Sequence, residues 1–346
     1  MPISANSKEV SQRLADAMRI LLSRTDRIGD LVLSTPAIAT VRKSFPDAHI
    51  TMVASAYNAI VMERNDDVNE VVILPREAKP SVFGQRFLGY DVAIALAPRR
   101  EDLELIGATR APIRVGYTYT RRYLARLTLP LFANRRMISE ADPDLCERQP
   151  LCHVRHESDQ LLDLVALAGA GMRVERLRID VRDDDRQGFE RLPADPIVFH
   201  LGQRWLEVGS TLESTRRLLI ELRSLGHPLL MTYAPDCQEA ADELCGSVDL
   251  CLGGLPFHRW AAVFERAACI VTVDTGATHV ASAMRRPTVV AFEHRYFRLN
   301  SQEWAPYRVP NTLVRKPESE SDEALAQFRS EIIDAVTNLL HGKNTR

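Results

Sequence analysis

The sequence lacks the long apolar segments of membrane-spanning and secreted proteins. No apolar run approaches the roughly 20 residues that a transmembrane helix requires. At the N-terminus, charged side chains at Lys8, Glu9, Arg13 and Asp16 precede any apolar segment, which is not the pattern of a signal peptide. We therefore expect a cytoplasmic protein.

The sequence also lacks an excess of charge and a clear metal-binding pattern. Lys plus Arg total 44 and Asp plus Glu total 46, so the formal net charge is −2 and we expect no nucleic-acid partner. The six cysteines are scattered, and in a cytoplasmic chain we expect reduced thiols. The spacing of Cys146, Cys152 and His153 fits no common zinc pattern. We therefore expect no metal site and metal-independent chemistry.

Two familiar nucleotide-binding motifs are missing as well. No Gly-x-Gly-x-x-Gly follows the first apolar strand, which disfavours an NAD enzyme, and there is no Walker A loop. With 45% hydrophobic and 26% charged residues, the composition is that of a soluble globular protein. A length of 346 residues suffices for about two domains.

Short apolar, β-branched runs alternate with helical spacers through most of the chain. This alternation predicts an α/β fold of two Rossmann-like, doubly wound domains with parallel sheets. The charged segment 182–196, which contains two prolines, is the predicted linker, so the domains are expected at 1–181 and 182–346. A long amphipathic helix predicted over 322–340 could pack back on the first domain.

One strand-turn-helix-strand unit stands out at Val271–Phe292. The apolar run Cys269–Val273 predicts a buried strand, a turn breaks it, and a helix is predicted over 277–284 before a second strand at Thr288–Phe292. In a parallel sheet such a turn lies at the carboxyl edge, where open α/β sheets bind ligands.

The residues of this turn suit a diphosphate. Gly276 allows close approach of the backbone, and the free amides of a helix start favour an anion. Thr275 and His279 are four residues apart and share one helix face. Because a carboxylate would repel phosphate, we expect Asp274 to hold the loop by accepting backbone N–H bonds. The alternative is that Asp274 merely caps the helix and His279 is a core histidine.

Two motifs carry a resemblance to a known family. The segment Asp274-Thr275-Gly276-x-x-His279-x-Ala281-x-Ala283, followed by a proline-led apolar strand, resembles the donor-site motif of the bacterial heptosyltransferases, which are ADP-heptose:lipopolysaccharide glycosyltransferases. In the first half, Arg24-Thr25-x-x-Ile28-Gly29-Asp30, continuing to Thr35-Pro36, is similar to the N-terminal signature of that family.

The resemblance implies an inverting glycosyltransferase of the GT-B architecture, with two domains facing across a cleft. It implies ADP-heptose as donor, the lipopolysaccharide inner core as acceptor, and no cofactor besides this substrate. Asp30 is the expected general base, and near a helix start it should remain ionised. Its alternative role is that of a helix N-cap. With such an acceptor, any contact of the protein with the inner face of the membrane would be peripheral.

The sequence departs from the family at one place. Relatives carry a Lys-x-Trp after the first strand of the second domain, where this chain has Arg204 and Trp205. Arg204 could bind the donor phosphate in place of lysine, or it could be a surface residue. The departure leaves open another nucleotide sugar or acceptor, or a non-catalytic nucleotide-sugar-binding homologue.

Arginines gather in the first domain, mostly after its later predicted strands. Such a cluster would hold an acceptor that carries phosphates and carboxylates, although a solvated charged face explains it nearly as well. The arginines that we assign to acceptor binding are Arg24, Arg121 and Arg122.

Overall fold

The computed structural model describes residues 18–141, 154–207 and 209–342. These residues divide into two compact units. Unit 1 takes its residues from Met1–Glu140 and Ser158–Glu175, and unit 2 from Ala141–Glu157 and Arg176–Arg346. The cluster of Cys146, Cys152 and His153 lies outside the described residues.

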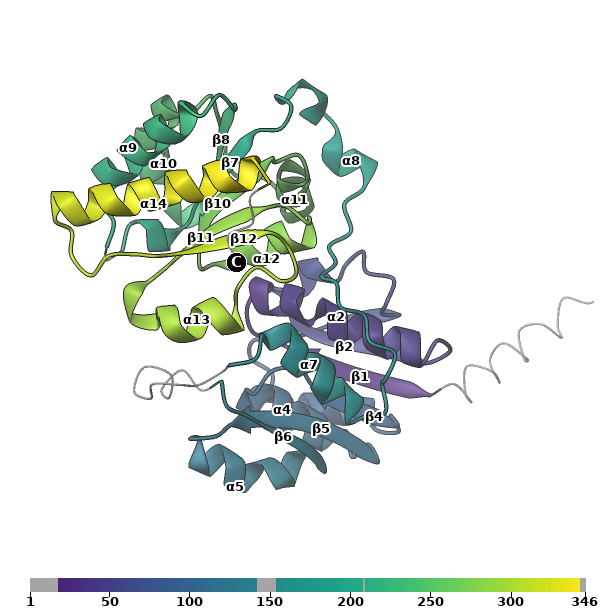
Figure 1. Ribbon diagram of the computed structural model, residues 1–346. Helices are drawn as coiled ribbons and strands as arrows, with labels where there is room; N and C mark the ends of the chain where they lie inside the picture. Colours follow the sequence, from purple (N-terminus) through teal and green to yellow (C-terminus); the bar gives the residue numbers. More distant parts are fainter. Residues whose placement is uncertain (1–17, 142–153, 208, 343–346) are drawn as a thin grey trace, which may run out of the picture. The chain divides into compact units, whose positions relative to one another are not determined.

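Unit 1 contains a six-stranded sheet in the order β3-β2-β1-β4-β5-β6, in which all neighbouring strands are parallel (Figure 1). Right-handed crossovers, the rule between parallel strands, place the helices before and after the reversal of strand order on opposite faces. The strands are β1 (Arg19–Arg24), β2 (His49–Ser55), β3 (Glu70–Leu74), β4 (Val92–Ala95), β5 (Ile113–Tyr119) and β6 (Arg135–Ser139). The helices are α2 (Ile28–Ser44), α3 (Pro80–Phe83), α4 (Arg100–Ala108), α5 (Tyr123–Phe132) and α7 (Glu157–Ala166), with 3-10 turns at Ala59–Val61 and Gly84–Phe87.

Unit 2 repeats this topology. Its parallel sheet runs β12-β11-β10-β7-β8-β9, which is the same pattern read from the other edge (Figure 1). The strands are β7 (Ile197–Leu201), β8 (Leu229–Tyr233), β9 (Leu250–Leu252), β10 (Cys269–Val273), β11 (Thr288–Phe292) and β12 (Asn311–Arg315). The helices are α8 (Asp183–Arg186), α9 (Leu212–Arg223), α10 (Gln238–Leu244), α11 (Phe257–Glu265), α12 (Gly276–Ala283), α13 (Phe297–Glu303) and α14 (Asp322–Leu340). Short 3-10 turns lie at Phe189–Arg191, Gln203–Trp205, Pro235–Cys237, Cys245–Ser247 and His294–Tyr296.

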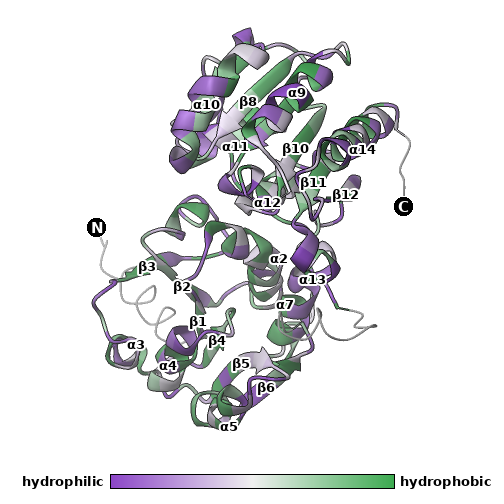
Figure 2. Ribbon diagram, turned by 90° about the vertical axis from the view of Figure 1, so that its left-hand side faces the viewer, coloured by the Kyte–Doolittle hydropathy of each residue, from purple (hydrophilic) through white to green (hydrophobic). Residues whose placement is uncertain are grey.

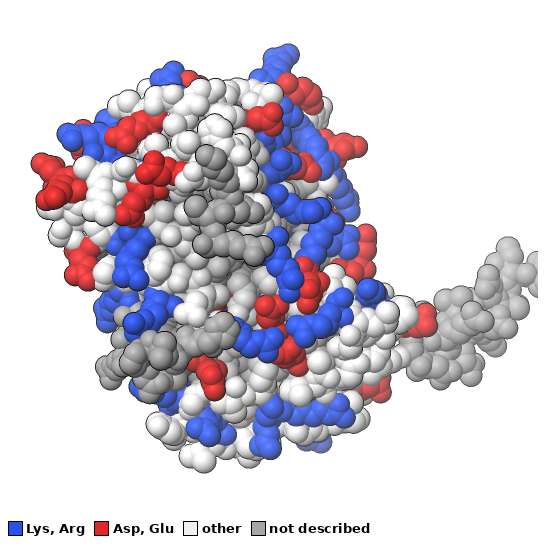
Figure 3. All heavy atoms as spheres, in the orientation of Figure 1, with Lys and Arg blue, Asp and Glu red and all other residues white. Residues whose placement is uncertain are grey.

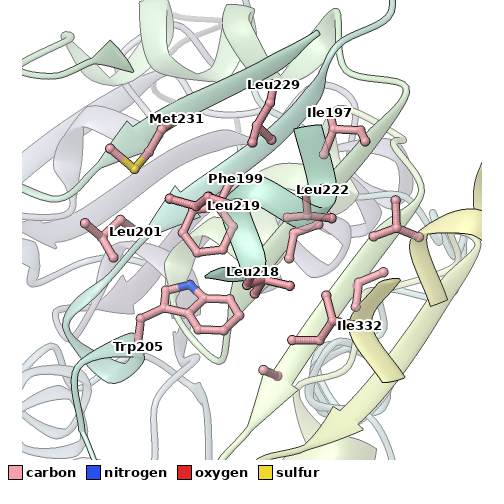
Figure 4. Packing of buried hydrophobic residues seen from close by; sticks show 14 of the residues in the cluster. Ile197, Phe199, Leu201, Trp205, Leu218, Leu219, Leu222, Leu229, Met231 and Ile332 are labelled. Atoms are coloured by element: carbon pink, nitrogen blue, oxygen red, sulfur yellow. The ribbon is translucent and has the colours of Figure 1, made fainter. Parts of the chain in front are cut away.

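The strands of unit 2 are apolar because both faces of the sheet are covered by helices. Figure 2 shows β8, β10 and β11 in the green of hydrophobic residues. Trp205 is fully buried, its ring centroid lies 4.8 Å from that of Phe199, and its Nε1 donates to the carbonyl of His200 at 2.9 Å (Figure 4). Helix α14 adds Phe328 and Ile332 to the same cluster, so it packs on the sheet of its own unit.

The structure agrees more closely with the predicted strands than with the predictions for the segments that connect them. Pro36 lies inside α2, which continues through it. The sequence over 58–63 predicts a helix, but the structure has a short 3-10 turn there, at Ala59–Val61. The sequence over 178–181 is compatible with a short strand, but this segment is irregular. After Tyr117 the sequence pattern weakens and predicts a long loop or short helices, whereas the structure has the end of β5, helix α5 and strand β6.

The prediction of reduced cysteines is wrong for one pair. Cys245 and Cys251 form a disulfide, with their Cα atoms 5.6 Å apart, which is an ordinary disulfide separation. Cys237 and Cys269 are free thiols, and burial raises the pKa of each to about 12, so neither is a reactive nucleophile.

Among the described residues, no helix combines the length and the hydropathy that a bilayer crossing demands.

Candidate active site

Each sheet has one point at which the strand order reverses. In unit 2 this point lies between β7 and β10, and in unit 1 it lies between β1 and β4. Doubly wound sheets bind ligands outside the carboxyl ends of these two strands, where the flanking loops run in opposite directions. The predicted donor residues follow β7 and β10, and Asp30 follows β1, so both motifs lie at such positions.

In unit 2, the turn between β10 and α12 presents the start of a helix. Thr275 is the N-cap residue, but its side chain makes no cap hydrogen bond with the helix; its Oγ1 donates to the carbonyl of Val273 at 3.3 Å. A Cβ added to Gly202, directly after β7, would lie 3.3 Å from Thr275 Cγ2, so the two loops approach closely. Thr275 and Gly276 are partly exposed, which leaves the helix start accessible.

Asp274 is the buried anchor of this turn. Its Oδ2 accepts from Arg204 Nη1 at 2.5 Å and from Asn300 Nδ2 at 2.8 Å. The carboxylate therefore joins the β10 loop to the β7 loop and to α13 through side-chain donors. Through these side-chain contacts Asp274 holds the loop, and the predicted bonds from backbone amides stay a prediction.

Arg204 is held in place and is still partly exposed. Its side chain is 35% exposed, whereas that of Asp274 is 8% exposed. Only one of its five N–H groups is needed for the bond to Asp274. The backbone of the same loop is fixed from β12, because Lys316 Nζ donates to the carbonyl oxygens of Arg204 at 2.5 Å and Glu207 at 3.2 Å.

Lys316 is a residue that the sequence prediction missed. It is buried, and burial lowers the pKa of its amine to about 8. Its position directly after β12, at the carboxyl edge of the sheet, could have indicated it, but β12 itself was not predicted.

His279 lies one turn into α12 and is buried, with 6% of its surface exposed. Its burial is what a core histidine would show, while its place above the helix start is what a donor ligand needs. The assignment of His279 to donor binding stays a prediction.

In unit 1, the loop after β1 is organised by a buried arginine. The Arg24 side chain is 3% exposed, and its Nε donates to Asp26 Oδ1 at 3.0 Å. Its Nη1 donates to the Leu96 carbonyl at 2.7 Å, and its Nη2 lies 3.4 Å from Asp30 Oδ1. The predicted acceptor contact of Arg24 stays a prediction, and the structure shows it positioning two carboxylates.

Asp30 is the third residue of α2 and its side chain is 23% exposed. The N-cap position belongs to Arg27, which makes no side-chain cap bond. The alternative that Asp30 is the N-cap is therefore wrong, because the helix begins three residues earlier than that role requires. Asp30 lies in the first turn, where the helix dipole favours a negative charge.

A second buried carboxylate supports the same loop. Asp102 of α4 accepts from Ser23 Oγ at 2.5 Å and from Thr25 Oγ1 at 3.0 Å. Burial raises the pKa of Asp102 to about 6, and the two hydroxyl hydrogen bonds oppose this rise. Because α4 was not linked to the motif by sequence, this contact was not predicted.

Arg121 and Arg122 lie just after β5, at the same sheet edge as Asp30. Arg122 is exposed and its guanidinium carbon lies 4.8 Å from the centre of the Tyr119 ring. Their predicted contact with an acceptor remains untested by this geometry. Within the described ranges, no group of three or more His, Cys, Asp or Glu side chains could hold a metal ion.

Comparison with known proteins agrees with the sequence motifs. Residues 225–330 match the profile of glycosyltransferase family 9 (heptosyltransferase). A protein of Escherichia coli named lipopolysaccharide heptosyltransferase 3 is 21% identical over 344 residues, covering 92% of this chain and 98% of the relative.

Solved structures show the same fold. A family 9 glycosyl transferase from Veillonella parvula DSM 2008 matches with a TM-score of 0.73 at 19% identity, over 94% of this chain and 98% of that one. The ADP-heptose lps heptosyltransferase II of E. coli matches with a TM-score of 0.70 at 17% identity, over 94% and 99%. The E. coli heptosyltransferase WaaC with ADP matches with a TM-score of 0.63 at 19% identity, over 92% and 100%.

The two parallel, doubly wound sheets and these structural relatives define the α/β fold of the GT-B architecture. The profile match over residues 225–330 and the similarity to these relatives support a place in the heptosyltransferase family, glycosyltransferase family 9.

Proposed function

We propose that this glycosyltransferase moves heptose from ADP-heptose to the lipopolysaccharide inner core, with inversion at the anomeric carbon. The observation that carries the proposal is the Arg204–Asp274 pair beside the start of α12, at the strand-order reversal of unit 2. This arrangement presents cationic and N–H donor groups where a nucleotide diphosphate would bind. The relative WaaC has been solved with ADP and with ADP-2-deoxy-2-fluoro heptose.

The groups proposed to contact the donor are those whose N–H or O–H donors remain accessible at the start of α12. Arg204 has unused N–H donors for a phosphate oxygen, and the amides of Gly276 and the following residue begin α12. Thr275 Oγ1 and His279 extend this set along one helix face. Asp274 stays behind Arg204 and neutralises part of its charge without facing the diphosphate.

The proposed chemistry assigns the base to unit 1. The Asp30 carboxylate takes the proton of the acceptor hydroxyl while the hydroxyl oxygen forms a bond to the anomeric carbon. The bond from that carbon to the diphosphate oxygen breaks, and ADP leaves with the electron pair. Arg24 orients Asp30 through its Nη2 contact, and Asp26 holds Arg24 from the other side.

The proposal includes metal-independent transfer, because Arg204 and the helix start supply the positive field that a metal ion would otherwise provide. Release of ADP from ADP-heptose should occur only with a core acceptor and should persist in EDTA. An absolute requirement for Mg²⁺ or Mn²⁺ would overturn the metal-free part alone.

The donor is tested by titration with ADP, followed by turnover with ADP-heptose and with other nucleotide sugars. If another nucleotide sugar is turned over faster than ADP-heptose, the proposed donor is wrong but the proposed transferase activity stands. If ADP binds and no donor or acceptor supports its release, the chain is a binding homologue and the proposed reaction is wrong.

A further inference from the structure

Helix α5 turns its apolar side to the solvent. Tyr123, Leu124, Leu127 and Leu131 are 70%, 80%, 75% and 74% exposed, while Leu129 is 1% exposed and packs into unit 1. Their spacing places the leucines along one side of the helix. Amphipathic helices of globular proteins normally bury this side, so a row of exposed leucines indicates an interaction surface.

The chain around this helix is strongly basic. Residues 105–139 contain no Asp or Glu, although the whole chain has a formal charge of −2. The arginines in this stretch are Arg110, Arg114, Arg121, Arg122, Arg126, Arg135 and Arg136. Where the structure describes their surroundings, none of them forms an ion pair with a carboxylate.

Strand β6 adds to the same side of unit 1. Ser139 Oγ bonds to Gln160 of α7, and Arg135 Nη1 donates to the Leu167 carbonyl just beyond α7. Because side chains alternate along a strand, Arg136 and Ile138 lie on the opposite sheet face, which α5 covers. Ile138 is 43% exposed.

The neighbouring carboxylates are already paired. On α4, which packs beside α5, Glu101 and Glu104 pair with Arg99 and Arg100. Blue and white spheres dominate the lower end of the molecule in Figure 3, where Figure 1 places α5. We name this surface the α5 face and define it by Leu124, Leu127, Leu131, Arg126, Arg136 and Ile138.

We propose that the α5 face docks on the surface of an anionic phospholipid bilayer. Exposed leucines enter the boundary between headgroups and acyl chains, and arginines bind lipid phosphates. A second copy of the chain fits less well, because two faces of the same positive charge would repel each other. A purely acidic protein surface would leave the leucines in water.

The position of α5 gives this docking a consequence for the enzyme. Helix α5 begins directly after β5, at the carboxyl edge of the sheet in which Asp30 follows β1. Docking through α5 would therefore hold this edge of unit 1 close to a bilayer. The docking itself is independent of the proposed donor and acceptor, and it can be measured without either.

The test is flotation of the full chain with phosphatidylcholine vesicles, with and without phosphatidylglycerol. We expect binding to the vesicles that contain phosphatidylglycerol, weak binding to pure phosphatidylcholine, and loss of binding at high salt because the attraction is screened. Absence of binding to the anionic vesicles would overturn the proposal.

Variants locate the surface. We expect combined Leu124→Ser, Leu127→Ser and Leu131→Ser substitutions to weaken binding about tenfold or more, since they remove the apolar contact. Arg126→Ser with Arg136→Ser should weaken it roughly 25-fold. The control is Ile220→Ser, which changes a 55% exposed residue of α9 in unit 2 and should bind as the parent does.

The remaining outcomes also decide the matter. If the leucine variant binds vesicles as tightly as the parent while its melting temperature is unchanged, the α5 face is not the docking surface. If light scattering shows a dimer that the leucine substitutions separate into monomers, and the parent ignores vesicles, the face is an interface between copies of this chain.

Discussion

Replacing Asp30 with asparagine separates a catalytic function from a structural one. The substitution keeps the shape of the side chain and removes the negative charge in the first turn of α2. If Asp30 is the base, turnover should fall roughly 10²- to 10⁴-fold. ADP affinity should change little, because the proposed diphosphate contacts all belong to unit 2.

The expected stability cost follows from the partners of Arg24. In Asp30→Asn, the guanidinium loses a contact of 3.4 Å but keeps its bonds to Asp26 and to the Leu96 carbonyl. Arg24 is therefore not left as an unpaired buried charge, which would cost about 3–5 kcal/mol. The lost ion pair and the lost dipole interaction together cost about 1–2 kcal/mol.

The assay combines ADP release with acceptor, ADP titration and thermal unfolding on the same variant. Asp26→Asn is the matched control, because Asp26 contacts the same arginine and its side chain is 15% exposed. Turnover within a few-fold of the parent in Asp30→Asn would refute the base assignment. A large loss in Asp26→Asn alone, with unfolding unchanged, would move the base to Asp26.

Three further predictions test the loops. His279→Ala should weaken ADP binding by about 1.5–3 kcal/mol if the ring donates to the diphosphate; unchanged affinity with a lower melting temperature would make it a core residue. Burial raises the pKa of Asp102 to about 6 from its ordinary 3.8, so the folded protein holds this proton more tightly than the unfolded chain does. The protonated side chain therefore adds about 3 kcal/mol to the unfolding free energy at low pH, and this contribution is lost as the pH rises from 3.8 to 6. Urea unfolding across this range should show that extra pH dependence in the parent and not in Asp102→Asn; equal slopes would contradict it. Gly209→Ala should destabilise the chain by about 1–3 kcal/mol, since Gly209 has φ +81° and a new Cβ would lie 2.3 Å from the Pro317 carbonyl oxygen. Gly254→Ala, at φ +64° with open space around it, is the control, and an equal loss there would exclude the clash.

Buried parallel strands were predictable because their sequence signal is local. Cys269–Val273 and Thr288–Phe292 are continuous apolar, β-branched runs, and the structure has both strands at these bounds. The helix of the motif that starts at Asp274 begins at Gly276, one residue before the predicted start, because Thr275 already serves as its N-cap.

The position of helix α5 and the existence of strand β6 were not predicted, for a physical reason. Most large apolar residues of α5 face solvent, Pro130 lies inside the helix, and two of the five residues of β6 are arginines. Sequence patterns detect elements by the side they bury, and these elements bury little. The same property that hid α5 makes it a candidate docking surface.

The partners that orient the candidate site could not be predicted because they come from distant segments. Asn300 is 26 residues from Asp274, and Lys316 is 112 residues from Arg204. Motif matching identified the residues at the strand ends, and only the folded sheet order brings the supporting side chains to them.

The two units use the same arginine–carboxylate pairing with opposite exposure. In unit 1 the arginine is buried at 3% exposure and Asp30 remains 23% exposed, so the accessible charge after the first strand is negative. In unit 2 Asp274 is buried at 8% and Arg204 remains 35% exposed, so the accessible charge is positive. A base needs the first arrangement and a diphosphate site needs the second. The proposed division of labour between the units therefore rests on which partner of each ion pair is buried, and exchanging Arg204 for glutamine should weaken ADP binding while leaving the environment of Asp30 unchanged.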